Sequence, residues 1–258
     1  MPLAPARGDE RFFLRAAILM TIVVVAGFST QLAAGRSTFN SPPLVHAHAI
    51  VFMGWVAIYL LQNVFAATER MALHRRLGWI AAGWMGPMVI LGCLVTGAMV
   101  RRGQVPFFFR PLQFLVFDPV TLFVFVGLTG AAILLHRRTE WHRRLHFCAM
   151  SLLLGPAFGR LLPMPLLQPW AWETIFAVTL LFPIAGILAD LRRSGHAHPA
   201  WRWGIGAMIG ALVITEAVTY SPVGVAIYRV VTAGSPGAAV PSLDFAPPPA
   251  GPLVTGRG

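Results

Sequence analysis

The chain has 258 residues, of which 57% are hydrophobic and only 11% are charged. This usage excludes an ordinary soluble domain and is typical of a polytopic membrane protein. The net charge of +11 comes entirely from arginines that lie close to the ends of apolar runs, which indicates contact with anionic lipid headgroups and argues against nucleic acid as a partner.

Apolar stretches long enough to cross a hydrocarbon core of about 30 Å recur along the chain. In order, the predicted spans are Phe13–Leu32, Leu44–Ala66, Leu77–Val100, Phe114–Leu135, His146–Leu162, Thr174–Leu191 and Trp203–Tyr220. We therefore predict an all-α transmembrane bundle of about seven spans within residues 1–232.

Two segments depart from a simple spanning pattern. The fifth span is short, contains Pro156 and carries Arg160 near its end, so we expect a broken or partly re-entrant helix there. The run Ser221–Thr232 is too short to cross the membrane. Residues 233–258 are rich in Pro, Gly and Ala, and this composition predicts a disordered tail.

The arginines also predict an orientation, because short cytoplasmic loops retain basic residues. Most of the 20 basic residues fall in the segments Arg7–Arg15, Arg70–Arg76, Arg137–Arg144 and Arg192–Arg202. We expect a cytoplasmic N-terminus and a periplasmic C-terminus in a bacterial inner membrane. Arg101, Arg102 and Arg110, in the loop after the third span, oppose this pattern.

Four ionisable residues inside apolar runs are the best functional clue. His48, Asp118, Arg160 and Glu216 belong to four different predicted spans, and all four fall towards the periplasmic face if the spans alternate. A charge at membrane depth costs at least a few kcal/mol, so such groups usually face the bundle interior and pair with one another. We expect them to form a polar pocket together with His46.

The second span indicates which way its histidines face. His48, Phe52, Trp55, Tyr59 and Gln62 recur at helical spacing and form a stripe that should face protein. The opposite side, which should face lipid, carries Ile50, Val51, Ala57, Ile58 and Leu61. His46 is rotated by about 200° from His48 on a regular helix, so only one of the two histidines should enter the bundle deeply.

The leading hypothesis for this pocket is a redox-associated cofactor site that holds haem b or a transition metal. Imidazole and carboxylate are suitable ligands, so His48, His46 and Asp118 are the candidate metal ligands. Arg160 would neutralise a propionate, and Glu216 would contribute to the cofactor pocket. The chain has no H-E-x-x-H or C-x-x-C-H pattern, and the residues do not say whether the protein is an enzyme.

Two alternatives remain open. In a small-solute transporter, Arg160 would bind an anionic group while Asp118 or Glu216 carried a proton. In a structural or accessory subunit, the same residues would form a network that locks the helices together, within a homo-oligomer or another membrane complex.

Histidines also occur on the predicted cytoplasmic side, at His74, His136, His142 and His146, where a second haem or metal is conceivable. The arginines around them disfavour another cation, so the sequence favours histidines at the level of the lipid headgroups.

Several short motifs carry a resemblance. His46-Ala47-His48 opens the second span, Leu73-His74-Arg75-Arg76-Leu77-Gly78-Trp79 leads into the third, and Asp118 and Arg160 lie in the fourth and fifth. Over about residues 12–220 the chain resembles a widespread group of bacterial multi-pass membrane proteins with no assigned activity. The resemblance implies a shared helical bundle with these residues at matching positions, and it implies no chemistry.

Overall fold

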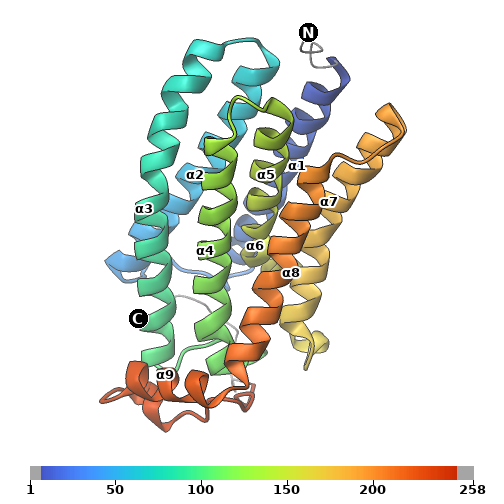
Figure 1. Ribbon diagram of the computed structural model, residues 1–258. Coiled ribbons are helices and arrows are strands. Elements are labelled where there is room, and N and C mark those ends of the chain that lie inside the picture. Colours follow the sequence, from blue (N-terminus) through green and yellow to red (C-terminus); the bar gives the residue numbers. More distant parts are fainter. Residues whose placement is uncertain (1–6, 249–258) are drawn as a thin grey trace.

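Residues 7–248 are described by the computed structural model, and they fold into helices with no β-sheet among them (Figure 1). The elements are α1 (Arg7–Ala33), α2 (Pro43–Ala67), α3 (Met71–Arg101), α4 (Pro111–Leu134), α5 (Thr139–Leu152), α6 (Gly155–Leu161), the 3₁₀ turn η1 (Met164–Leu167), α7 (Ala171–Ser194), α8 (Pro199–Thr219), α9 (Pro222–Thr232) and the 3₁₀ turn η2 (Pro236–Ala239).

The long helices run up and down along one bundle axis. In Figure 1 the start of α1 and the α2–α3, α4–α5 and α7–α8 connections lie at one end, and α9 lies across the other end. The helices α2, α4, α8 and α9 each begin with proline, whose fixed φ and missing N–H suit the first helical position. We call the first end the basic end, because it carries most of the arginines, and the other the α9 end.

Five helices, α1, α2, α3, α4 and α7, are long and apolar enough to cross a membrane. Their outward faces carry large apolar side chains in mid-helix, such as Ile22 (57% exposed), Ile90 (60%) and Phe123 (60%). Exposed apolar surface of this extent is unusual for a water-soluble protein and suits lipid. The chain is therefore a multi-pass membrane protein.

The face prediction for α2 is confirmed except at Ile58 and at Val51, which is half-buried and packs against the core. Trp55 and Tyr59 are buried, while Ile50 (69% exposed) and Leu61 (43%) face outward. Ile58 was expected to face lipid, yet it is only 8% exposed, because α2 packs against both α1 and α3 and so has more than one covered side.

The predicted fifth span is broken, as Pro156 suggested. It consists of α5 and α6, separated by a turn at Leu153 and Leu154, with Pro156 in the first turn of α6. Pro87, Pro119 and Pro183, in contrast, lie inside continuous helices. At the end of the bundle, α8 and α9 are bent by 76° relative to one another.

The described part of the segment after α9, residues 233–248, is hydrogen-bonded to the bundle, and the disorder expected for residues 233–258 stays a prediction. Tyr228 donates a hydrogen bond that is shared between the carbonyls of Gly237 and Val240, each 3.2 Å away. The Leu112 N–H donates to the Ser242 carbonyl at 2.8 Å. Residues 233–248 are thus fastened to the α9 end, and residues 249–258 lie outside the described part.

Helices α1 and α6 approach each other closely at Gly27. A Cβ added at Gly27 would lie 2.8 Å from the carbonyl oxygen of Ala157 and 3.0 Å from its Cα. These are backbone atoms that cannot rotate away, so only glycine fits. Small residues of this kind allow membrane helices to pack closely.

Gly27→Ala is expected to destabilise the protein by about 1–3 kcal/mol, the usual cost of overpacking. Gly83→Ala is the matched control, because no atom lies within 4 Å of a Cβ there and alanine is the better helix former. Unfolding of both variants in detergent measures the difference. Equal stability of the two variants would contradict the close α1–α6 contact.

Candidate functional site at the α9 end

The structure confirms that the four predicted ionisable residues share one end of the bundle. His48 lies in the second turn of α2 and Asp118 at the start of the third turn of α4. Arg160 and Glu216 lie in the last turns of α6 and α8. Helices α2 and α4 start, and α6 and α8 finish, in the half of the bundle towards α9 (Figure 1), so all four residues lie in that half.

The two histidines of α2 have different environments. The His48 ring stacks on Phe52, with ring centroids 4.1 Å apart, and its Nδ1 is enclosed without a hydrogen-bond partner. His46 turns to the preceding loop instead, where its Nε2 donates to the Phe39 carbonyl at 3.0 Å. Only His48 enters the bundle, as the helical rotation between the two positions predicted.

Asp118 and Arg160 come close to His48. Thr96, buried on α3, donates from its hydroxyl to Asp118 Oδ2 at 3.0 Å. Arg160 is near enough to interact electrostatically with both Asp118 and His48. No Asp118 oxygen, however, lies within the 4.0 Å of an Arg160 nitrogen that a salt bridge requires.

The Arg160 side chain is held by a backbone carbonyl and an aromatic ring rather than by an acid. Its Nη1 donates to the Pro156 carbonyl at 2.8 Å, and its guanidinium carbon lies 4.2 Å from the Phe28 ring centroid. The Arg160 carbonyl accepts a hydrogen bond from Gln31 Nε2 at 3.0 Å. Helix α1 thereby fixes Arg160 through two side chains.

Glu216 belongs to a different cluster, which corrects the prediction of one pocket. The buried amide of Gln113 donates to Glu216 Oε1 at 3.0 Å. Glu173 interacts electrostatically with Glu216 and Arg110, and Glu173 Oε2 is enclosed without a partner. Two clusters therefore share the α9 end, one centred on Arg160 and one on Gln113.

The predicted metal site is not assembled. Among residues 7–248, no group of three or more His, Cys, Asp or Glu side chains is placed to hold a metal ion. His46 points away from His48, and Glu216 is held by Gln113. A ligand set of His46, His48 and Asp118 is thus unsupported. For a haem, only one histidine, His48, would be available as an axial ligand at this site.

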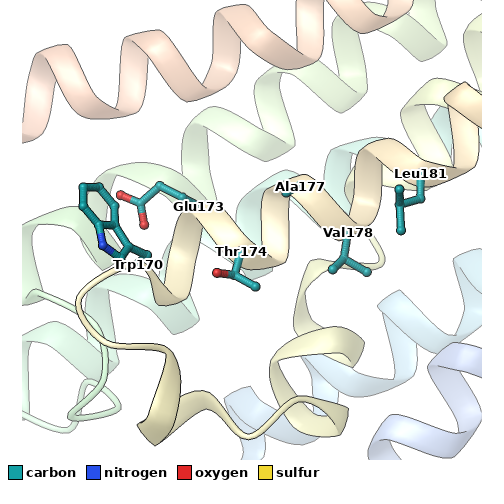
Figure 2. A pocket seen from close by; sticks show the side chains of 6 residues that line it. All are labelled: Trp170, Glu173, Thr174, Ala177, Val178 and Leu181. Atoms are coloured by element: carbon teal, nitrogen blue, oxygen red, sulfur yellow. The ribbon is translucent and has the colours of Figure 1, made fainter.

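A shallow groove runs along the outer side of α7 near the Gln113 cluster. Figure 2 shows its lining side chains in a row from Trp170 and Glu173 to Leu181. The groove has a volume of about 470 Å³, is wide open and is mostly apolar. An open apolar groove on a membrane-facing helix suits a lipid chain better than a polar ligand.

The basic end contains an ion-pair network that the sequence did not reveal. Arg144 is buried and makes two hydrogen bonds to Asp190, from Nε at 2.9 Å and Nη2 at 2.7 Å. The Nε1 of Trp201 also donates to Asp190, at 2.7 Å. Asp190 thus joins α5, α7 and α8.

The network extends to α1 and to the start of α5. Asp9 pairs with Arg143 and, at 2.7 Å, with Arg193, and Glu140 pairs with Arg143 and Arg144. Burial alone would raise the pKa of Glu140, but hydrogen bonds and charge from these two arginines lower it below its ordinary value. Arg143 and Arg144 therefore support the packing of four helices.

Two arginines that opposed the predicted orientation have structural partners. Arg101 donates from Nη1 to the Val231 carbonyl of α9. The Arg110 guanidinium carbon lies 4.5 Å from the ring centroid of Phe245 and 5.8 Å from that of Tyr220. Both arginines hold the chain after α8 against the α9 end. These packing contacts explain why basic residues lie at this end of the bundle.

No protein-family model, curated protein or solved structure matches the chain.

Proposed function

We propose that this protein is a seven-span bacterial inner-membrane protein, with its basic end in the cytoplasm, that binds a small carboxylate-bearing solute at the α9 end. Arg160 would bind the carboxylate, and His48 would donate or accept one hydrogen bond. Asp118, held by Thr96, would exchange a proton as part of a transport cycle.

The observation that carries this proposal is the incomplete pairing of Arg160. A guanidinium has five N–H donors, and one of them is used, on the Pro156 carbonyl. No carboxylate in residues 7–248 forms a salt bridge with it, although Asp118 is near enough to interact electrostatically. A charge at membrane depth normally has a partner or a function, and the planar fork of arginine fits a carboxylate in two-point contact.

His48 supports the same conclusion. Its Nδ1 is enclosed without a partner, which costs free energy unless another group satisfies it. A ligand held between Arg160 and His48 would supply the missing partner of Nδ1. The two residues are close enough to interact electrostatically. One bound solute would therefore satisfy both residues, with its carboxylate accepting from the unpaired donors of Arg160 and a second polar group pairing with the isolated nitrogen of His48.

Arg160→Gln is expected to weaken the stabilisation of the protein by a bound carboxylate. Acetate, succinate and inorganic phosphate serve as probes of the purified protein in detergent. A ligand at 100 times its Kd raises the stability of the folded state by about 2.7 kcal/mol. Loss of a charged hydrogen bond costs about 1.5–3 kcal/mol, so the affinity should fall roughly 10- to 150-fold.

Arg102→Gln is the control, because Arg102 is an exposed arginine near the same end, and it should respond to the probes like the wild type. Arg160→Lys separates charge from shape, since lysine keeps the charge without the planar fork. If no carboxylate stabilises the wild type more than Arg160→Gln, the proposal is wrong and Arg160 is a structural partner of Phe28.

A further inference from the structure

Three imidazoles gather at the basic end, far from the proposed solute site. His74 comes from the first turn of α3, and His142 and His146 lie one turn apart on α5. The ring centroids of His74 and His142 are 6.1 Å apart, and those of His142 and His146 are 4.7 Å apart. His74 also interacts electrostatically with His146, so the three rings form one group, which we call the histidine cluster.

Two of these rings are oriented by backbone carbonyls of other helices. His74 Nδ1 lies 3.3 Å from the Gln62 carbonyl of α2, and His142 Nδ1 lies 2.8 Å from the Ala132 carbonyl of α4. A carbonyl oxygen only accepts hydrogen bonds, so Nδ1 carries the proton in both rings. In a neutral imidazole this leaves Nε2 with a free lone pair.

This arrangement is the one that orients histidines as metal ligands. A metal-binding histidine usually donates its other ring N–H to a carbonyl or carboxylate, which fixes the tautomer and increases the basicity of the coordinating nitrogen. Here the two donations come from different helices and hold the two rings side by side. An imidazole set with no thiolate or carboxylate suits Zn²⁺, Cu²⁺ or Ni²⁺.

The positive charge around the histidine cluster is smaller than the sequence suggests. Arg143 and Arg144 are neutralised by Asp9, Glu140 and Asp190. Arg75, which acts electrostatically on His74, is exposed to solvent, where salt and water screen its charge. The arginines near the histidine cluster therefore disfavour a bound cation much less than their number suggests.

We propose that the histidine cluster binds one divalent transition-metal ion, with Nε2 of His74 and Nε2 of His142 as the primary ligands. A tetrahedral ion about 2.0–2.1 Å from two imidazole nitrogens places the ring centroids about 5 Å apart. The centroids of His74 and His142 are 6.1 Å apart, so the two rings move about 1 Å closer together to share one ion. No three ligands within residues 7–248 are preassembled. His146 therefore joins by side-chain rotation, and water completes the shell.

The test is metal binding by the full chain in detergent after removal of metal with a chelator. Zn²⁺ is titrated into the wild type, His74→Gln, His142→Gln and the control His196→Gln. His196 is an exposed histidine whose ring also lies against a carbonyl, that of Ser194. The wild type and His196→Gln are expected to bind one equivalent with equal affinity, and the two cluster variants at least tenfold more weakly.

A spectroscopic measurement on the wild type keeps the proposal testable even if both cluster variants fold poorly. One equivalent of Cu²⁺ bound to the wild type should give an electron paramagnetic resonance spectrum with coupling to at least two imidazole nitrogens. The proposal is overturned if the wild type binds no Zn²⁺, if a folded cluster variant binds it as tightly as the wild type, or if the Cu²⁺ spectrum lacks that coupling. None of these results bears on Arg160, which lies at the other end of the bundle.

Discussion

Asp190→Ala is expected to lower the free energy of unfolding by about 3–5 kcal/mol, the cost of leaving one member of a buried ion pair alone. Asp190 is 3% exposed and Arg144 is 4% exposed. The same carboxylate accepts the Trp201 Nε1–H and, at 3.2 Å, the backbone N–H of His198. Its removal would leave Arg144 with only the partly exposed Glu140 and the more distant Asp9.

Unfolding in detergent at increasing denaturant measures this effect. Arg192→Gln is the control, since Arg192 lies two residues away on an exposed position of the same helix, where a substitution usually changes stability by less than about 0.5 kcal/mol. A loss of less than 1 kcal/mol for Asp190→Ala would show that the ion pair does not hold α5, α7 and α8 together.

Trp201→Ala is expected to cost a similar 3–5 kcal/mol, as removal of a large aromatic side chain from a core usually does. Trp201 has no exposed surface. Its ring occupies the space beside Gly186, where an added Cβ would lie 2.3 Å from the indole. It also packs against Phe147, with ring centroids 5.4 Å apart.

Trp201→Phe separates packing from hydrogen bonding, because phenylalanine keeps an aromatic ring but cannot donate to Asp190. We expect it to cost about 1–3 kcal/mol. The double variant of Asp190→Ala and Trp201→Phe should cost less than the sum of the two single variants, since both remove the same hydrogen bond. Strict additivity would mean that this contact contributes nothing.

The sequence predicted the helical bundle because its signals are local. Apolar runs, their arginine-rich ends and Pro156 in the fifth span were enough to place the helices and the break between α5 and α6. The rotation of His46 away from His48 also followed from helical geometry alone. These features depend on residues within one helix, so neighbouring helices did not alter them.

The partners within the bundle could not be predicted in the same way. Glu216 was expected beside Asp118 because both have the same depth, but depth does not fix the position around the bundle axis. The Gln113 amide, on α4, decides that Glu216 faces a different cluster. Gln113 was overlooked because a single amide in an apolar run is not a recognisable motif.

The ion-pair network at the basic end was missed for another reason. Arg143 and Arg144 were read as a cytoplasmic loop signal, but α5 begins at Thr139 and carries both of them into the bundle. Asp190 lies three residues before Arg193, a spacing that fits a local helical pair. Only the packing of α5 against α7 and α8 shows that Asp190 also binds Arg144.

Side-specific cysteine labelling tests most directly the central claim that the chain crosses the membrane seven times with the α9 end outside. In a background with Cys93→Ala and Cys148→Ala, single cysteines replace Phe39 (76% exposed), Leu166 (82%) and Leu134 (82%). A maleimide that cannot cross the inner membrane should label Phe39→Cys and Leu166→Cys in intact cells of a bacterial host, and Leu134→Cys only after membrane disruption. Labelling of Leu166→Cys only after disruption would show that α5 and α6 do not cross, and would contradict the proposed arrangement of Arg160 with His48 and Asp118 at one face.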